Sequence, residues 1–164
     1  MKASLAPGLT FVRQFEVDRA RTIDFMGEQG RVYATPSLVR DIEMTCREGL
    51  LGHVDSGEDS VGTRVELDHL APTLLGMAVK IEARVAEVKG RLVTFELSAR
   101  DSLDEIARGK HVRFIVEVRK SAERLKAKAA KAAAAFCQLC RPGNRGARRI
   151  SMTRICLRSC CCDL

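Results

Sequence analysis

The alternation of apolar and polar residues in the middle of the chain constrains the fold more than any other sequence feature. Four successive stretches alternate, and each predicts a β-strand that buries one of its two faces. A Lys89-Gly90 turn joins the second and third stretches and makes them antiparallel neighbours. We therefore expect an antiparallel meander with one covered face. The four stretches are residues 60–69, 77–88, 91–100 and 105–118.

The apolar residues of each stretch identify the face that we expect to be buried. In the first stretch Val61, Thr63, Val65 and Leu67 share a face, and His69 has the same parity. His69 is therefore predicted to point inward at the end of a strand, just before a Leu-Ala-Pro turn. The inward residues of the later stretches are Met77, Val79, Ile81, Ala83 and Val85, then Val93, Phe95, Leu97 and Ala99, then Val112, Phe114, Val116 and Val118.

A single amphipathic helix over residues 36–51 precedes these strands. Thr35 before Pro36 predicts the helix start, with Thr35 as the N-cap and Pro36 at the first helical position. Glu43 borders the apolar sector, where a carboxylate costs free energy if it is buried without a partner. The apolar sector consists of Leu38, Val39, Ile42, Cys46 and Leu50, and the charged residues further round are Arg40, Asp41, Arg47 and Glu48.

One helix covered by an antiparallel sheet is an α+β fold. A short strand at residues 11–17 adds to the sheet, so we expect five or six strands. Residues 1–118 are long enough for one domain with its own core. Their apolar runs are far shorter than the roughly 18 residues that span a bilayer. The first residues lack the continuous apolar segment of a secretory signal, so a cytoplasmic location is expected.

Residues 119–164 differ in composition from the rest of the chain. Residues 1–118 carry a charge balance of −3, whereas residues 119–164 carry +10, so the basic pI says little about the ligand of the domain. Six of the seven cysteines lie in this tail, and a domain whose one cysteine is Cys46 is typical of a reducing compartment. The tail begins with an Ala- and Lys-rich, helix-forming segment and then loses all periodicity. We interpret residues 119–164 as a disordered or non-native tail.

Two functional interpretations of the tail stay open. Cys137-x-x-Cys140 and the triplet Cys160–Cys162 offer thiolates to zinc, although a triplet suits tetrahedral geometry poorly. The arginines of residues 141–158 could bind nucleic acid or an anionic membrane, but apart from Phe136 the tail has no aromatic residue on which bases stack. We expect no metal, nucleic acid or membrane partner.

Several separated blocks resemble one family of enzymes. Ala34-Thr35-Pro36 and a helix with Glu43 are followed by GEDSVGT, DHLAPTLLGM and VKGRLVTFELSARDSLDEIARGKHVR. In this order, over about residues 8–118, they resemble the fluoroacetyl-CoA thioesterase type of hotdog-fold thioesterase. The resemblance implies a hotdog fold, with an antiparallel sheet wrapped around one long central helix. It also implies hydrolysis of a short acyl-CoA thioester by a homodimer with its sites at the subunit interface; whether two dimers associate further is left open.

The resemblance also assigns roles to individual residues. It implies a catalytic threonine, glutamate and histidine, a glycine beside the thioester, an arginine near the site, and an aromatic lid. The lid falls on residues 25–30, where this chain reads FMGEQG and has Met and Gly in place of large rings. The candidate catalytic residues are Thr35, Glu43 and His69, and the candidate substrate-binding residues are Gly62, Arg113 and Phe25.

The three catalytic candidates suit thioester hydrolysis on chemical grounds as well. A desolvated Glu43 can act as a base or a nucleophile, and His69 can exchange a proton near neutral pH. Thr35 lies at a helix start, where backbone N–H groups attract negative charge. Each also has a structural alternative, as a cap, an exposed edge residue and a packed turn residue. Their joint occurrence favours an enzyme, without a metal or redox cofactor, over a non-catalytic acyl-CoA binding protein of the same fold.

The remaining histidines and the cysteine of the domain carry no such support. We expect His53 and His111 to be surface residues. Cys46 lies one helical turn from Glu43, but a cysteine on an apolar stripe is usually part of the core.

Overall fold

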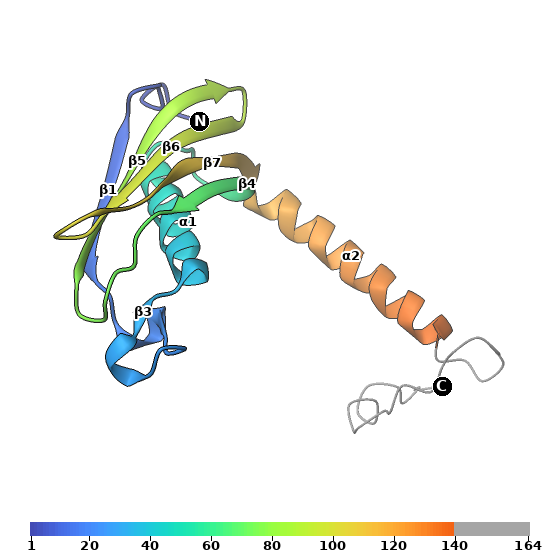
Figure 1. The fold of residues 1–164 in the computed structure, drawn as a ribbon. Coiled ribbons are helices and arrows are strands. Elements are labelled where there is room, and N and C mark those ends of the chain that lie inside the picture. Colours follow the sequence, from blue (N-terminus) through green and yellow to red (C-terminus); the bar gives the residue numbers. More distant parts are fainter. Residues whose placement is uncertain (140–164) are drawn as a thin grey trace. The chain divides into compact units, whose positions relative to one another are not determined.

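The computed structural model describes residues 1–139, and its main element is a five-stranded antiparallel sheet that curves around helix α1 (Figure 1). This arrangement confirms the predicted α+β class. The strand order is β1-β5-β6-β7-β4. The elements are β1 (Thr10–Glu16), α1 (Thr35–Leu51), β4 (Glu58–His69), β5 (Ala78–Lys89), β6 (Leu92–Arg100) and β7 (Glu105–Glu117).

The meander is shorter than predicted. Strands β5, β6 and β7 follow one another in the sheet, but β4 pairs with β7 and β5 pairs with β1. The turn after β5 is tight, whereas residues 70–77 form a longer connection that carries the chain from β4, at one edge of the sheet, to β5, which lies next to β1 at the other edge. Strand β4, which ends at His69, is therefore an edge strand.

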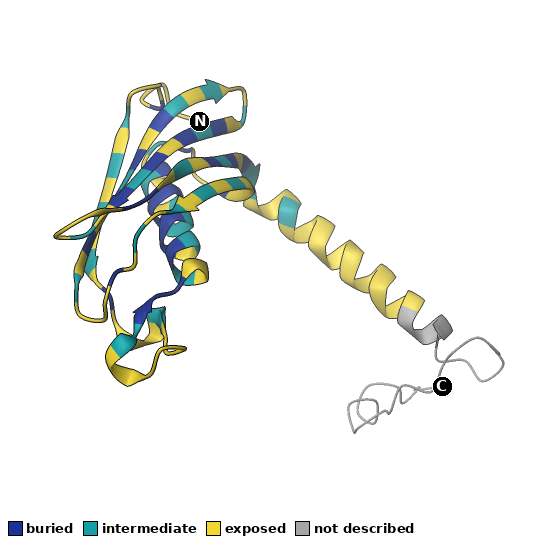
Figure 2. Cartoon of the chain, viewed as in Figure 1, coloured by how far each residue is buried: buried dark blue, intermediate teal, exposed yellow. Residues whose placement is uncertain are grey.

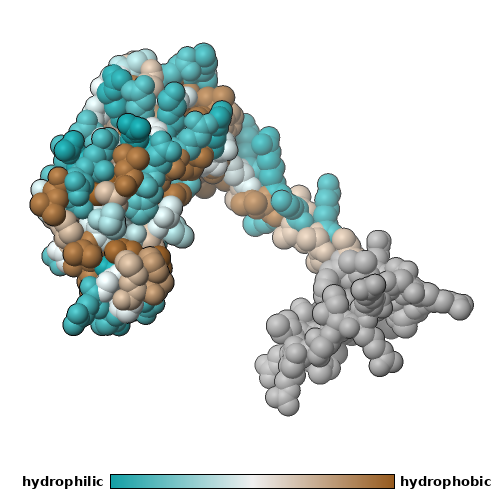
Figure 3. Space-filling model, in the orientation of Figure 1, coloured by the Kyte–Doolittle hydropathy of each residue, from teal (hydrophilic) through white to brown (hydrophobic). Residues whose placement is uncertain are grey.

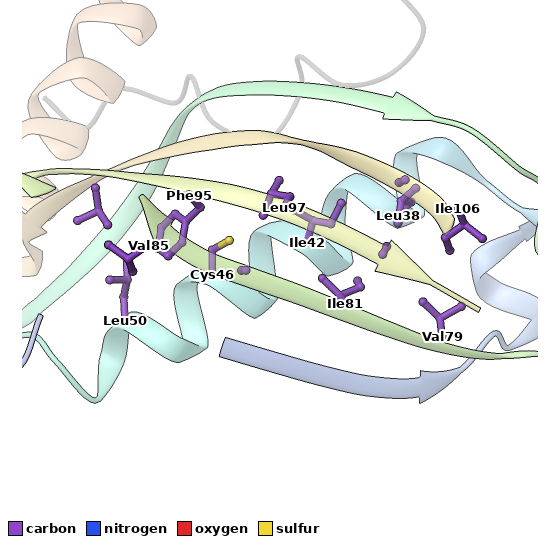
Figure 4. Close-up of a cluster of buried hydrophobic side chains, with 14 of the residues drawn as sticks. Leu38, Ile42, Cys46, Leu50, Val79, Ile81, Val85, Phe95, Leu97 and Ile106 are labelled. Carbon is purple, nitrogen blue, oxygen red and sulfur yellow. The ribbon is translucent and has the colours of Figure 1, made fainter. Parts of the chain in front are cut away.

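The core lies between α1 and the concave face of the sheet (Figure 4). The predicted inward residues of β6 are all buried, as are those of β5 from Val79 onward. Buried residues recur along the sheet-facing side of α1 and at alternate positions of the central strands (Figure 2). The helix contributes Leu38, Ile42, Cys46 and Leu50, and the strands contribute Val79, Ile81, Val85, Phe95, Leu97 and Ile106.

Strands β4 and β7 depart from the predicted faces. The pairing of β4 with β7 shifts register between Gly62 and Arg64, which is a β-bulge. Because the bulge reverses the parity of β4, Val61 is exposed on the outer face, while Ser60 is buried and Gly62 faces α1. The prediction for Val61 is therefore wrong.

Strand β7 is turned over relative to the prediction. Its buried residues in the C-terminal half are His111, Arg113 and Ile115, whereas Phe114 is exposed. Both faces of this half offer apolar residues, so apolar content alone did not decide between them. Of the predicted inward set, Val112, Phe114 and Val116 lie on the outer face, and Val118 is the first residue of α2.

A small two-stranded sheet precedes α1. Strands β2 (Thr22–Ile23) and β3 (Val32–Tyr33) pair with each other, and Val32 forms a bridge to Leu74 in the connection after β4. The 3₁₀ turns η1 (Arg19–Arg21) and η2 (Glu28–Gly30) flank β2 and precede β3. Phe25 and Met26 are exposed between them, and Figure 3 shows hydrophobic surface around this segment.

The rest of the described chain is helix α2 (Val118–Leu139). The chain divides into two units, Met1–Ser121 and Ala122–Leu164. Over residues 119–139 the tail is helical, in keeping with its Ala- and Lys-rich, helix-forming composition. Within residues 1–139, none of the helices has the length and hydropathy needed to cross a membrane.

Candidate active site

Thr35 and His69 are brought together at the start of α1. The helix begins at Thr35 with Ala34 at the N-cap position and without a side-chain cap hydrogen bond, so the predicted capping role of Thr35 is wrong. The Thr35 hydroxyl instead lies 2.9 Å from Nδ1 of His69. The predicted inward direction of His69 is consistent with this contact between the last residue of β4 and the first residue of α1.

The His69 imidazole has one engaged and one free nitrogen. Nε2 is buried and has no hydrogen-bond partner among the described residues. Desolvation lowers the pKa of His69, and a backbone hydrogen bond with Ala71 opposes that shift. A lowered pKa makes the neutral imidazole the dominant form at pH 7. A neutral imidazole with a free nitrogen can accept a proton or donate one to a reacting group.

An open pocket of about 260 Å³ adjoins this pair. Phe25 forms part of its wall, so the structure brings this candidate substrate-binding residue to Thr35 and His69. Two larger hollows, of about 500 and 440 Å³, contain none of the candidate catalytic residues. The lining of the smaller pocket is Ile23, Phe25, Val32, Tyr33, Thr35, His69, Leu70, Ala71 and Pro72.

Glu43 belongs to a second cluster, with Gly62 and Arg113. Its side chain is 41% exposed, and its carboxylate lies 3.9 Å from the Arg113 guanidinium, whose side chain is 4% exposed. A Cβ atom on Gly62 would lie 3.2 Å from Oε1 of Glu43. The glycine therefore leaves the space beside the carboxylate open.

Arg113 is held by a nearly complete set of acceptors. Nε and Nη2 donate to the hydroxyl and the carbonyl of Ser60, at 2.9 and 2.7 Å, and Nη1 donates to the Glu43 carbonyl at 3.2 Å. A buried guanidinium needs such partners, because leaving its N–H groups unpaired costs more than an ordinary hydrogen bond. Arg113 thereby ties β7 both to β4 and to α1.

His111 completes the second cluster and corrects a sequence prediction. It is fully buried, not a surface residue. Nδ1 lies 2.8 Å from the Arg64 carbonyl, and Nε2 lies 3.1 Å from Nη1 of Arg113. The carbonyl needs a donor and the guanidinium needs an acceptor, so His111 is neutral with its proton on Nδ1. Desolvation and, less strongly, the charge of Arg113 lower its pKa.

The three catalytic candidates do not meet within one chain. Thr35 and His69 form a pair, whereas Glu43 lies about two helical turns, or roughly 12 Å, further along α1. Gly62 and His69 are likewise separated along β4, with His69 at its end and Gly62 in its first half. The domain thus carries two half-sites, one with an imidazole and a hydroxyl and one with a carboxylate beside a buried cation.

The other groups that the sequence singled out do not add to these half-sites. Cys46 is fully buried, and desolvation raises the pKa of its thiol to about 12, which fits the predicted core role. Among residues 1–139, no group of three or more His, Cys, Asp and Glu side chains is placed to hold a metal ion. The cysteine and arginine side chains proposed for zinc or nucleic acid lie outside the described residues.

Comparison with known proteins gives the family. The family model for the fluoroacetyl-CoA-specific thioesterase matches residues 17–119. The fluoroacetyl-CoA thioesterase of Streptantibioticus cattleyicolor is 30% identical over 127 residues, which cover 73% of this chain and 91% of that protein.

Solved structures agree with this match. A thioesterase superfamily member from Thermus thermophilus is 29% identical, with a TM-score of 0.72 over 79% of this chain and 96% of that chain. A variant of the fluoroacetyl-CoA-specific thioesterase in complex with fluoroacetate and CoA is also 29% identical, with a TM-score of 0.65 over 71% of this chain and 98% of that chain. The chain therefore belongs to the fluoroacetyl-CoA-specific thioesterase family of hotdog-fold thioester hydrolases.

Proposed function

We propose that this protein hydrolyses a short-chain acyl-CoA thioester to the free acid and CoA, without a metal or redox cofactor. The observation that carries the proposal is the Thr35–His69 hydrogen bond beside a small pocket, with Nε2 of His69 still free. Drug-sized ligands occupy pockets of roughly 300–1,000 Å³, so a pocket of about 260 Å³ favours a short acyl group. The related thioesterase that binds fluoroacetate and CoA supports the same substrate class.

Each half-site offers a different part of the chemistry. In the proposed mechanism, Glu43 either activates a water that attacks the thioester carbonyl, or attacks the carbonyl itself and forms an anhydride that water then hydrolyses to the free acid. Gly62 lets the thioester approach the carboxylate, and the buried charge of Arg113 holds that carboxylate in place. His69 polarises the carbonyl or returns a proton to the leaving thiolate, and the Thr35 hydroxyl orients its ring.

We further propose that a homodimer combines the two half-sites. Among the described strands, β4 pairs with β7 alone, so its other edge offers free backbone groups to a second copy. Two copies of one strand that pair around a two-fold axis are antiparallel. With the axis at Glu66 and Thr63 as the extra residue of the bulge, Gly62 would lie opposite His69 of the partner subunit. Because both residues face inward, the partner's imidazole would approach Glu43.

A panel of acyl-CoA substrates tests the activity. Free thiol released from acetyl-CoA and longer acyl-CoAs is measured for the wild-type protein and for Glu43→Gln and His69→Ala. We expect turnover of the short substrates that either substitution removes. Wild-type rates equal to those of both variants would contradict a thioesterase site here, and saturable acyl-CoA binding without turnover would indicate a binding protein.

Mixing the two inactive variants tests the shared site. After subunit exchange, about half of the dimers carry one chain of each kind, and each of these has one intact site. We therefore expect recovery of about a quarter of the wild-type activity. If Glu43 and His69 act within one chain, the mixture stays inactive.

A further inference from the structure

A buried carboxylate lies outside both half-sites. Asp41 is 5% exposed, although the sequence pattern placed it away from the apolar sector of α1. It accepts hydrogen bonds from the Tyr33 hydroxyl at 2.7 Å and from Nε of Arg21 at 2.8 Å. Burying a charge is costly unless partners compensate it, so these contacts are needed for Asp41 to occupy this position at all.

The partners of Asp41 are themselves constrained by packing. Tyr33 is 1% exposed, and desolvation, reinforced by the hydrogen bond with Asp41, raises the pKa of its phenol, so the hydroxyl remains a donor. The Arg21 guanidinium lies 4.9 Å from the centre of the Phe15 ring, which in turn packs edge-on against Tyr33. Side chains from β1, η1, β3 and α1 therefore form one compact unit.

The backbone of the same residues joins the two segments that carry Thr35 and His69. The N–H group of Ala34 donates to the Arg21 carbonyl at 2.9 Å. The N–H group of Tyr33 donates to the carbonyl of Thr73, in the connection that follows His69, at 2.8 Å. Tyr33 is thus fixed to α1 through its side chain and to the His69 connection through its main chain.

We propose that Arg21, Asp41 and Tyr33 are positioning residues that hold the Thr35 hydroxyl against His69. Thr35 follows Tyr33 by two residues, and the start of α1 has no side-chain cap that would fix it otherwise. The Thr35–His69 contact is a single hydrogen bond, so its geometry depends on how the two segments are held. The inference rests on the proposed function of that pair.

Tyr33→Phe and Asp41→Asn test the proposal, because both keep the size of the side chain. Thr45→Val is the matched control: the Thr45 hydroxyl is buried on the same helix and donates to the Asp41 carbonyl at 2.7 Å, without a link to Thr35. We measure kcat and KM for acetyl-CoA, the melting temperature, and the NMR titration of His69. Thr35→Val provides the reference titration for an imidazole that has lost its hydroxyl partner.

We expect Tyr33→Phe and Asp41→Asn to lower kcat by at least about tenfold with KM within about twofold, since small misplacements of catalytic groups act on kcat. The titration of His69 in these variants should move toward that of Thr35→Val. All three substitutions should lower the melting temperature by a few degrees. Thr45→Val alone should keep the wild-type kcat and the wild-type titration of His69.

The proposal is overturned if Tyr33→Phe keeps the wild-type kcat, or if Thr45→Val loses as much. A wild-type protein that turns over none of the short acyl-CoAs of the panel would instead contradict the proposed function. In that case the NMR titration of His69 tests the positioning role without any activity measurement. An unchanged titration in Tyr33→Phe overturns that role, and a shift toward the titration of Thr35→Val supports it.

Discussion

The two half-sites place an imidazole in opposite surroundings. His69 is part-exposed beside an open pocket and touches one neutral hydroxyl, that of Thr35. His111 is fully buried, and both of its nitrogens are occupied, one of them by Arg113. Both ring nitrogens of His111 are bonded within the protein, whereas Nε2 of His69 has no hydrogen-bond partner among the described residues. This difference is consistent with the proposal that His69 takes part in the chemistry, while His111 holds the Arg113 guanidinium beside Glu43.

The largest effect on kcat is expected for Glu43, which is the partly exposed charged group of the second half-site. Glu43→Gln should lower kcat for acetyl-CoA by about 10³-fold, as for the loss of a general base or a nucleophile. Thiol release under saturating substrate measures this. Glu48→Gln is the control, because Glu48 lies on the same helix with an exposed side chain. A Glu43→Gln variant that keeps more than about a tenth of kcat would mean that the carboxylate only shapes the site.

A smaller effect on kcat is expected at Gly62, the residue of the second half-site that has no side chain. A Cβ atom on Gly62 would lie 3.1 Å from Cε1 of His111 and 3.2 Å from Oε1 of Glu43, so one of them must move. Gly62→Ala should lower kcat by about tenfold to a hundredfold through misplacement of the carboxylate. It should also lower the free energy of unfolding by about 1–3 kcal/mol through overpacking.

Kinetics and urea unfolding of Gly62→Ala measure these two effects. Gly52→Ala is the control, because a Cβ atom there would meet only a carbonyl oxygen at 3.8 Å. Equal effects at the two glycines would show that the space beside Glu43 has no special role.

The regular parts of the sheet could be predicted from the sequence, and the parts that build the site could not. In β6, and in β5 from Val79 to Val85, the period of two holds, so the inward residues were assigned correctly there. Beyond Val85 the pairing of β5 with β6 shifts register. In β4 the bulge after Gly62 reverses the parity, and Val61 and Thr63 continue an apparent alternation that hides it, because the inward residue Ser60 is polar. The inward residues could be predicted where the alternation is regular. The second half-site lies where the bulge in β4 interrupts it.

The predicted inward face of strand β7 was wrong for a different reason, and the sequence contained a clue to the correct face. The resemblance placed Arg113 near the site, whereas the apolar pattern turned Val112 and Phe114 inward. These two predictions conflict, because neighbouring residues of a strand face opposite sides. Giving weight to Arg113 would also have turned His111 inward, two residues earlier. Buried Asp41 had no such clue, since its partners Arg21 and Tyr33 are distant in sequence.

The two histidines should contribute differently to the pH dependence of the protein's free energy of unfolding. Burial lowers the pKa of both His69 and His111 below the unfolded value of about 6.5. Below pH 6.5 the unfolded chain then binds more protons than the folded one, so stability is full above that pH and is lost as pH falls through the folded pKa. His111 should contribute more of this loss, because it is fully buried and faces Arg113.

Replacing each histidine by glutamine separates the two contributions. Glutamine does not titrate, and at position 111 its amide can still accept from Arg113 and donate to the Arg64 carbonyl. Urea midpoints measured between pH 7 and 5 should vary less in His111→Gln than in His69→Gln. The opposite order would mean that His69 is the more strongly desolvated ring.

The smallest effect is expected at Cys46, which lies one helical turn from Glu43 but faces the core. With its thiol pKa raised to about 12, almost no thiolate exists at neutral pH, and an unexposed thiol cannot reach a substrate. Cys46→Ala should keep kcat within about twofold and lower the free energy of unfolding by about 1 kcal/mol, as for a small core truncation. Thiol release and urea unfolding check the two values. A large loss of kcat without loss of stability would place a nucleophile inside the buried core, and the assignment of the chemistry to Glu43 and His69 would no longer hold.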